Sequence, residues 1–392
     1  MESKEVRMVG IYGLEGVDKT TIAKATYNTF YHGGLLQLQE TLLSEEMWDD
    51  DLKLGNVHRD DYEKDIFLDI ACSSRERVSS YVTESLESCD LYPNSGIAVL
   101  INKSLITIES GKLETHDMIQ EMGREIVWRE SPKEPGECSR LWFYEDVLHV
   151  PTEGMGTNKV EAIMLKLGTP KEVRFGAQAF VNMKRLRFFL ARNEYHSGYP
   201  IYFPAELRWL DWPDFSVPST PFNTGHKKLV YLDPSKSSIR ILGKEFKLFG
   251  NLRIVNFSHR TLLTEIPDVL SLPNLESLDS QECTNLVEVH QSIGCLDKLV
   301  YLNFLYYYNI SRFPGNLQSM TLQNLIHRGC SKLSRFPDIL VTMKCLKELV
   351  LHETAIKDLP SSITNLIGLK ELYLRDCLDL KNLPCSIYTL QL

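Results

Sequence analysis

The chain has 392 residues, 43% of them hydrophobic and 24% charged, so it is long enough for two or three folded domains and lacks the composition of a disordered protein. A formal net charge of −9 gives it no overall basic field for nucleic acid or for an anionic membrane. The sequence contains no signal-peptide core and no apolar run of membrane-spanning length, and its nine cysteines form no CxxC pair. We therefore expect a cytoplasmic protein, with nuclear residence also allowed, that has reduced thiols, no membrane span and no direct contact with nucleic acid.

The first motif is a phosphate-binding loop between a short strand and a helix. Residues 8–12, MVGIY, predict the strand, and residues 20–27 predict the helix. The loop between them, GLEGVDKT, matches the template G-x-x-x-x-G-K-[ST] except at the second glycine, where Asp18 stands. In that template, backbone N–H groups hold phosphates, the lysine reaches the outer phosphates and the hydroxyl binds magnesium. The residues still able to serve are Gly13, Gly16, Lys19, Thr20 and Thr21, with Thr20 as a weak magnesium ligand.

Asp18 weakens any nucleotide site in this loop. A carboxylate about 4 Å from a phosphate charge costs about 1 kcal/mol under water-like screening and about 4 kcal/mol at an effective dielectric constant near 20. A torsion that only glycine adopts without strain would add about 1 kcal/mol. The affinity for ADP or ATP should therefore fall by a factor of about 30 to a few thousand. An ordinary glycine-containing turn between strand and helix remains the alternative interpretation.

Residues 1–60 are also too short for a complete nucleotide-binding domain. Only about forty residues separate Thr21 from Tyr62, whereas each strand–helix–strand unit of such a sheet needs about 30. The stretch IFLDI imitates the missing acidic strand, but Asp69 lies within an amphipathic run that predicts a helix. Residues 1–60 therefore predict a truncated P-loop remnant.

Residues 61–150 predict a mainly helical domain. Its clearest element is the segment HDMIQEMGREIV, in which the pair His116–Asp117 opens a helix. The apolar face of this helix is made by Met118, Ile119, Met122 and Ile126. From the residues alone, His116 and Asp117 are interpreted as a capped helix start.

An internal repeat organises residues 151–392. The pattern Leu-x-x-Leu-x-Leu, with other apolar residues sometimes in place of leucine, recurs every 22 to 24 residues in its clear copies. These copies open at Leu207, Leu229, Leu252, Leu275, Leu299, Leu322, Leu346 and Leu369, and weaker copies open at Val160 and Leu186. Such a period is typical of leucine-rich repeats, in which each unit adds one short strand to a curved parallel sheet. We therefore predict an α/β fold: a leucine-rich-repeat solenoid of about nine units, preceded by a mainly helical domain and the P-loop remnant.

Two other residue types keep the same period. A proline after an apolar residue marks the return segment of most units, at Pro267, Pro314, Pro337, Pro360 and Pro384, and His290 fills the remaining slot. Cys283, Cys330 and Cys377 each stand eight residues after an opening leucine, the place of an inward group that satisfies backbone polar atoms in the turn. Because they lie two repeats apart, about 10 Å by the strand spacing, they are predicted to be structural thiols without disulfides.

The residues between and after the leucines are predicted to face the concave surface of the sheet. Aromatic and arginine side chains carry most of the binding energy of protein interfaces, so this surface suits the recognition of a protein partner. A merely solvated face is the alternative for any single residue. The partner-binding residues predicted from this pattern are Trp209, Asp211, Tyr231, Asp233, Tyr301, Arg328, Tyr373 and Arg375.

These segments together resemble plant intracellular disease-resistance proteins of the nucleotide-binding, leucine-rich-repeat type, specifically the class that carries a TIR domain. The resemblance covers nearly the whole chain, and its segments occur in the family's order. Besides the repeats, the matching stretches are residues 8–28, 34–45, 62–72, 96–127 and 131–150.

The resemblance implies a nucleotide-binding module (NB-ARC) that holds ADP at rest and exchanges it for ATP, with Mg²⁺, while the repeats sense a pathogen product or restrain the switch. Thr115-His116-Asp117 is similar to the family's Met-His-Asp motif, in a winged-helix-like subdomain where His116 would approach the β-phosphate. The stretches that would match the TIR domain and most of the nucleotide-binding domain do not occur in this sequence, so on this resemblance we expect a truncated or internally deleted member, a degraded gene copy or a mis-spliced form.

Three functions follow as hypotheses. The first is an innate immune receptor with weakened ADP or ATP binding, whose repeats bind a pathogen effector, a guarded host protein or other immune receptors. The second is a leucine-rich-repeat adaptor or decoy that binds proteins and no nucleotide. The third is a P-loop ATPase, which the defects around Asp18 disfavour; we expect no enzyme activity.

Overall fold

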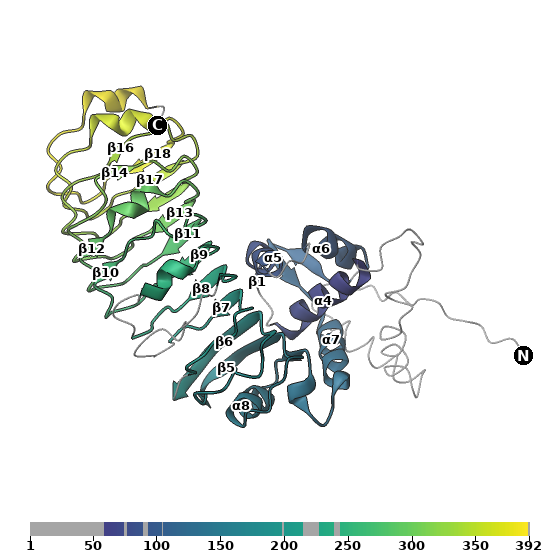
Figure 1. Ribbon diagram of the computed structural model, residues 1–392. Helices are drawn as coiled ribbons and strands as arrows, with labels where there is room; N and C mark the ends of the chain where they lie inside the picture. The colour runs from purple at the N-terminus through teal and green to yellow at the C-terminus, as the bar shows by residue number, and fades with distance from the viewer. Residues whose placement is uncertain are drawn as a thin grey trace, which may run out of the picture. The chain divides into compact units, whose positions relative to one another are not determined.

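The computed structural model describes residues 59–73, 77–88, 93–103, 105–197, 200–214, 227–238 and 244–390 (Figure 1). The chain divides into two compact units, Met1–Asp65 and Ile66–Leu392. The phosphate-binding loop predicted at residues 8–21 lies outside the described residues. Apart from the start of the first described helix, all the features that follow belong to the second unit.

A helical domain with a small β-sheet comes first. Its helices are α4 (Arg59–Cys72), α5 (Ser79–Ser88), α6 (Pro93–Asn102) and α7 (Asp117–Glu130). Its strands β1 (Arg77–Val78), β2 (Thr107–Glu109) and β3 (Lys112–Glu114) form an antiparallel sheet in the order β1–β3–β2. The helix predicted around Asp69 is confirmed as α4, although it ends at Cys72 and the rest of the predicted run forms β1 and α5.

Close packing of α4 against α7 explains a glycine in the middle of α7. A Cβ atom added to Gly123 would lie 2.4 Å from the Cβ atom of Ala71 and 3.2 Å from the ring of Phe67. Glycine therefore lets the two helices approach, at the usual cost of backbone freedom. Phe67 and Ala71 are fully buried, together with Val127 on α7.

The repeats form one parallel sheet, which confirms the predicted solenoid. Among the described residues, eleven strands pair in chain order, and every pair in this sheet is parallel. The strands are β4 (Arg140–Leu141), β5 (Ala162–Arg174), β6 (Phe188–Ser197), β7 (Trp209–Asp211), β8 (Tyr231–Asp233), β9 (Ile254–Asn256), β11 (Ser277–Asp279), β13 (Tyr301–Asn303), β15 (Asn324–Ile326), β17 (Glu348–Val350) and β18 (Glu371–Tyr373). The sheet thus begins before residue 151, where the repeats were predicted to start, and helix α8 (Tyr144–Thr152) follows its first strand.

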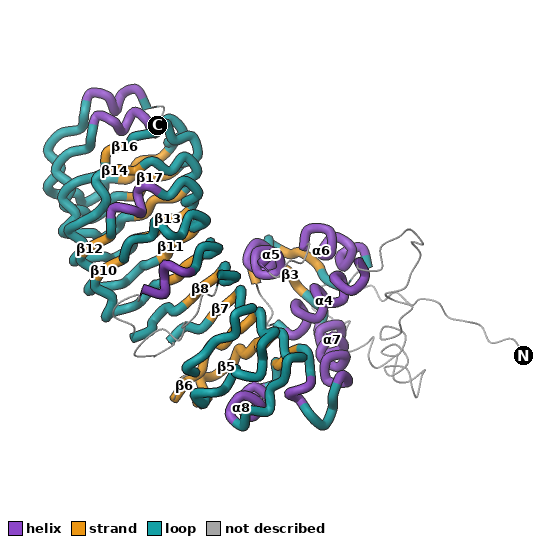
Figure 2. Tube along the Cα trace, in the orientation of Figure 1, coloured by secondary structure: helices purple, strands orange, loops and turns teal. Residues whose placement is uncertain are grey.

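The return segments contain short helices and two-stranded sheets (Figure 2). The 3₁₀ helices of the return segments are η2 (Lys244–Leu248), η3 (Gln291–Cys295), η4 (Ser361–Asn365) and η5 (Cys385–Thr389), whereas η1 (Pro135–Glu137) precedes β4, the first strand of the long parallel sheet. The small parallel sheets pair β10 (Glu265–Ile266) with β12 (Glu288–Val289), and β14 (Asn316–Leu317) with β16 (Asp338–Ile339). Pro360 and Pro384 precede η4 and η5, and His290 caps η3 by accepting a hydrogen bond from the N–H of Ser292. His290, Pro360 and Pro384 therefore mark where the short helices of their return segments begin.

The turn after each strand of the long parallel sheet from β7 to β18 has a recurrent backbone conformation. The residue seven places after the opening leucine has a positive φ between 57° and 75° in eight repeats, at Asp214, Lys236, His259, Glu282, Tyr306, Gly329, Glu353 and Asp376. In three of these repeats the next residue is a cysteine that donates to a carbonyl oxygen of the preceding repeat: Cys283 Sγ to Phe257 at 3.0 Å, Cys330 Sγ to Phe304 at 3.2 Å and Cys377 Sγ to Leu351 at 2.9 Å. The structural role predicted for these three cysteines is confirmed, and all three thiols are free.

One hydrophobic core runs from Leu141 to Leu369 under the sheet. The leucines that open the repeats are buried, and the residues between them alternate toward the other side of the sheet. Within the part of the chain that the structure describes, no helix has the length and apolar character needed to cross a membrane.

Candidate functional site

His116 is the one predicted nucleotide-binding residue that the structure describes. Gly13, Gly16, Lys19, Thr20 and Thr21 lie outside the described residues. His116 is exposed and directly precedes α7, where its carbonyl oxygen accepts a hydrogen bond from the N–H of Gln120 at 2.9 Å. This geometry fits the helix-cap interpretation. Its contact with a β-phosphate stays a prediction.

The first four predicted partner-binding residues are buried, contrary to the expectation of an open surface. Trp209 and Asp211 are 0% exposed, Asp233 is 2% and Tyr231 is 6% exposed. The indole ring of Trp209 stacks on the ring of Phe188 at a centroid distance of 6.0 Å and on the ring of Tyr231 at 3.9 Å. These rings come from adjacent strands β6, β7 and β8, so in this structure they hold the strands together and offer no open face.

Asp211 and Asp233 are engaged within the sheet as well. The Nε of Arg192 lies 2.8 Å from Asp211, and its Nη2 lies 3.5 Å from Asp233. Asp233 also accepts hydrogen bonds from the N–H of Ser235 at 3.0 Å and from the side-chain amide of Asn256 at 3.1 Å. Burial, and then the neighbouring Asp211 carboxylate, raise the pKa of Asp233. Asp233 therefore orders the turn after β8, and both carboxylates bind Arg192.

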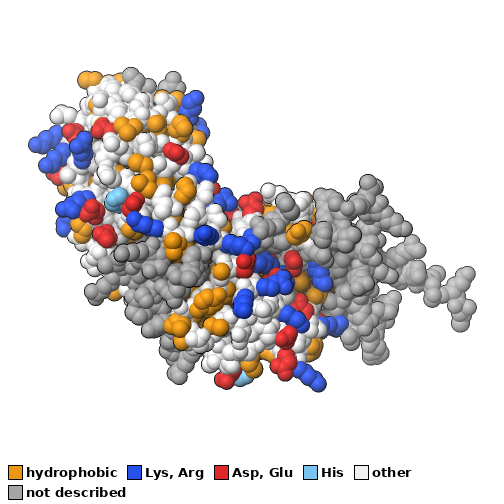
Figure 3. Space-filling view, viewed as in Figure 1, with side chains coloured by type: hydrophobic (Ala, Val, Ile, Leu, Met, Phe, Trp, Pro, Cys, Tyr) orange, Lys and Arg blue, Asp and Glu red, His pale blue; other side chains and the backbone are white. Residues whose placement is uncertain are grey.

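A series of arginines, here called the arginine row, joins the first repeats to the helical domain. Its members lie at or directly before the start of strands β4, β6, β7 and β9: Arg140, Arg187, Arg208 and Arg253. Each contacts a carboxylate or carbonyl oxygen of α4 or α5. On the face shown in Figure 3, acidic side chains lie among the basic ones.

Asp69 of α4 is the centre of this junction. Its carboxylate binds Arg140 Nε at 2.8 Å and Arg187 Nη2 at 3.1 Å, and all three side chains are nearly buried. Burial alone would raise the pKa of Asp69, but the guanidinium groups of Arg187 and Arg140 hold it below its usual value. The residue that imitates the acidic strand of a nucleotide site thus serves as a buried counter-ion for the repeats.

Helix α5 also contacts the arginine row, at the starts of strands β7 and β9 of the repeat sheet. Arg208 Nη1 donates to the carbonyl oxygen of Ser88 at 2.6 Å, and Arg253 Nη1 lies 3.9 Å from Glu87. Arg253 is held in place by two hydrogen bonds to Glu276, at 2.8 and 3.0 Å. The end of α5 therefore lies beside strands β7 and β9.

The other four predicted partner-binding residues remain accessible, and with His352 they define the open face. Arg328 and Arg375 are exposed, Tyr373 is 38% exposed, and Tyr301 and His352 are partly exposed. The Tyr373 ring lies 5.5 Å from the ring of His352, whose Nδ1 accepts a hydrogen bond from the N–H of Arg375 at 3.0 Å. The open face thus combines aromatic rings, an imidazole and two guanidinium groups on strands β13 to β18 and their turns.

The sequence pattern missed the arginine row. A signal for it was present, because Arg187, Arg208 and Arg253 all stand one place after the first residue of their units. The position of an arginine within its unit does not predict its partner. Arg187 contacts Asp69, which lies 118 residues away in the sequence, and Arg208 contacts Ser88, which lies 120 residues away.

Comparison with known proteins confirms the resemblance inferred from the motifs. Residues 60–131 match a domain family described as "Disease resistance protein Roq1-like, winged-helix domain". TMV resistance protein N of Nicotiana glutinosa is 36% identical over 346 residues, which cover 87% of this chain and 30% of that protein. Disease resistance protein RPP2A of Arabidopsis thaliana is 33% identical over 334 residues, which cover 83% of this chain and 25% of that protein. The chain thus spans less than a third of the length of either relative.

Solved structures with a similar arrangement are leucine-rich-repeat proteins. The leucine-rich-repeat domain of the type III effector XopL matches with a TM-score of 0.35 and 22% sequence identity, over 45% of this chain and 70% of that chain. A likeness of this strength concerns the fold only and carries no functional argument.

Proposed function

Because residues 60–131 match the winged-helix domain of Roq1-like disease resistance proteins and most of the chain is homologous to plant disease resistance proteins, we propose that this chain acts in a plant immune receptor. In this proposal the repeats recognise a protein, either a pathogen product or a guarded host protein, through the open face. The observation that carries it is the accessible group of Arg328, Tyr373 and Arg375, residue types that dominate the energetics of protein interfaces.

The nucleotide part of the proposal rests on residues 13–21 and His116. ADP or ATP with Mg²⁺ would bind there weakly, because Asp18 repels the phosphates, and turnover of ATP is not expected. The receptor would act inside the cell, in the cytoplasm with nuclear residence also allowed, as a switch without enzyme activity.

A complementation experiment in a plant line with the gene disrupted tests the recognition surface. The native gene should restore the resistance response, and a gene with Arg328→Ala, Tyr373→Ala and Arg375→Ala should not, at equal protein level. A control of the same composition, Arg312→Ala, Arg335→Ala and Tyr388→Ala, changes exposed residues of the return segments and should restore the response. Full resistance with the open-face variant would reject the proposed surface.

The competing function is a protein-binding adaptor without nucleotide. Titration of the purified chain with fluorescent ADP, in the native form and with Lys19→Ala or Asp18→Gly, distinguishes the two. Magnesium-dependent binding that Lys19→Ala abolishes would reject the adaptor, and an unmeasurable affinity in all three forms would favour it. If Asp18→Gly binds no more tightly than the native chain, the charge argument about Asp18 is wrong.

A further inference from the structure

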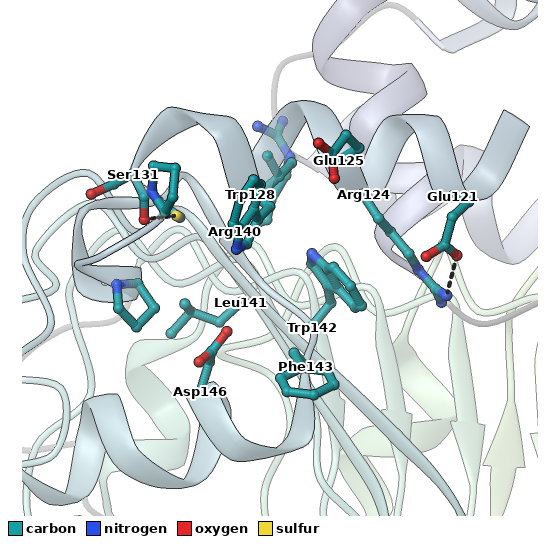
Figure 4. Close-up of a pocket in the computed structure, with 14 residues that line it drawn as sticks. Glu121, Arg124, Glu125, Trp128, Ser131, Arg140, Leu141, Trp142, Phe143 and Asp146 are labelled. Carbon is teal, nitrogen blue, oxygen red and sulfur yellow. Dashed lines mark hydrogen bonds and ion pairs between the residues drawn. The ribbon is translucent and has the colours of Figure 1, made fainter. Parts of the chain in front are cut away.

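A cavity of about 400 Å³ lies between helix α7 and the segment that leads from it through β4 to α8 (Figure 4). Trp128 lines it from α7, Trp142 and Phe143 from the turn after β4, and Asp146 from the first turn of α8. Its volume is in the range of sites for small molecules or for single side chains of a partner. None of the residues of the open face lines it.

Aromatic rings form much of the accessible wall. Trp128 is 50% exposed and Phe143 is 49% exposed, so both rings present apolar surface at the cavity. Trp142 already receives a cation, because the guanidinium carbon of Arg124 lies 4.8 Å from the centre of its ring. This contact shows that the wall is suited to cation–π interactions, which are strongest for tryptophan.

Most charged groups of the cavity are already paired. Arg140 binds Asp69, as described for the arginine row. Glu125 accepts a hydrogen bond from Arg129 at 2.9 Å, and Glu121 lies 3.9 Å from Arg124. These pairs leave the two arginines of the cavity compensated.

Asp146 differs from these residues. Its side chain points toward the cavity in Figure 4, and it forms no hydrogen bond or ion pair with any side chain of the described residues. Burial and then Glu145 raise the pKa of the Asp146 carboxyl, while His149 lowers it in part, as expected for an anion that lacks a bound cation. A carboxylate in the first turn also interacts favourably with the α8 dipole, but that role does not require it to face the cavity.

We propose that this cavity binds an organic cation, an alkylammonium or guanidinium group on an apolar stem, with its charge beside Asp146 and its stem against Trp128 and Phe143. A free polyamine and a lysine or arginine side chain of a peptide both present this chemistry. The site is independent of the proposed recognition function, because it shares no residue with the open face.

Two probes of equal shape test the charge requirement. n-Butylguanidinium and its neutral analogue N-butylurea are titrated into the purified chain, and binding is followed by saturation-transfer NMR. The cation should bind at least tenfold more tightly than the urea. Equal affinities would overturn the proposal without any need for a variant.

Variants then locate the site. Asp146→Asn keeps the shape of the side chain and should weaken butylguanidinium binding at least fivefold, whereas Glu145→Gln, the exposed neighbour that does not line the cavity, should change it less than twofold. Trp128→Leu should also weaken binding. An unchanged affinity in Asp146→Asn, or the same loss in both carboxylate variants, would reject Asp146 as the anchor.

Competition identifies the natural source of the cation. Spermidine and the capped peptide acetyl-Leu-Lys-Leu-amide are each added to the complex with butylguanidinium. Displacement at a lower concentration of spermidine would indicate a free polyamine as the natural ligand, and displacement at a lower concentration of the peptide would indicate a side chain of a peptide. Failure of both to displace the probe would contradict the proposal.

Discussion

The first and last repeats place the same positions on the same side of one sheet, yet only the last repeats leave them accessible. Asp211 and Tyr373 both stand four places after the opening leucine, and Asp211 is 0% exposed whereas Tyr373 is 38% exposed. In the first repeats, aromatic stacking and Arg192 engage this side, and the arginine row contacts α4 and α5 at the starts of the strands. Position within a repeat therefore decides which side of the sheet a residue faces, and the neighbouring elements decide whether that side is open.

The largest expected difference between the two regions is in the free energy of unfolding. Trp209→Ala should lower it by about 3–5 kcal/mol, because it removes a buried ring that stacks on two neighbours. Tyr373→Ala, in the open face, should change it by about 0.5 kcal/mol or less. Urea unfolding of the two variants measures both values. Equal losses would mean that the open face is as structural as the first repeats.

Breaking the junction at Asp69 should cost about 3 kcal/mol. Asp69→Asn leaves Arg140 and Arg187 buried without their shared counter-charge. Because the folded-state pKa of Asp69 is lowered, its stabilisation is present above the unfolded value of about 3.9 and is lost as the pH falls through the folded pKa. Acid unfolding of the variant, with the exposed Asp379→Asn as control, tests this. A loss no greater than that of the control would show that the arginine row does not depend on Asp69.

The core beneath the open face contains a destabilising polar residue, His327, at a position of its repeat where leucine is expected. Both ring nitrogens are buried and have no hydrogen-bond partner in the part of the chain that is described, and the ring lies between Phe304 and Phe313. His327→Leu should therefore stabilise the fold by about 1–3 kcal/mol. Differential scanning calorimetry of the variant at pH 7 measures the gain.

The same residue should make stability depend on pH. Burial lowers the pKa of His327 to about 3, so the unfolded chain takes up its proton near pH 6.5 and the folded chain does not. Its contribution is intact above pH 6.5 and is lost toward pH 3, by up to about 1.4 kcal/mol per pH unit. The slope should disappear in His327→Leu and persist in the exposed control His149→Gln. A slope that is unchanged in His327→Leu would assign it to other groups.

The smallest effect is expected at the cysteine donors that link successive repeats, Cys283, Cys330 and Cys377. Cys330→Ala should cost about 1 kcal/mol, because the Phe304 carbonyl loses its hydrogen bond, and Cys295→Ala, at an exposed site, should cost less. Burial raises the pKa of the Cys330 thiol to about 12, so a thiol reagent at pH 8 should modify Cys295 and Cys385 well before Cys330. Early modification of Cys330 in the folded chain would contradict the buried donor.

The sequence was sufficient to predict what depends on local periodicity. The leucine spacing predicted parallel strands at the right residues, and the cysteines eight places after Leu275, Leu322 and Leu369 were predicted as structural thiols. These features repeat because each unit packs on an almost identical neighbour. The same packing requirement therefore recurs many times along the amino-acid sequence.

Contacts between distant segments were not predictable in the same way. Asp69 was predicted to lie in a helix, but its two arginine partners and the burial of Trp209 depend on how that helix meets the repeats. Arg140 precedes the first clear repeat and carries no periodic signal at all. The sequence likewise provided no reason to select Asp146 as a site residue, because a carboxylate in the first turn of a helix is common. Only its position in the wall of the cavity distinguishes it from other such carboxylates.

The hydrogen bonds from Cys283, Cys330 and Cys377 to the preceding repeats have a consequence for how the exposed surface can evolve. The Cys330 thiol donates to the unit directly before it, and each repeat of a solenoid contacts only its neighbours, so the energetic effect of a substitution fades within one or two units. Unequal exchange between gene copies could therefore replace one unit, with its exposed side chains, and leave the others folded. A repeat protein of this kind can therefore acquire new exposed side chains at little structural risk.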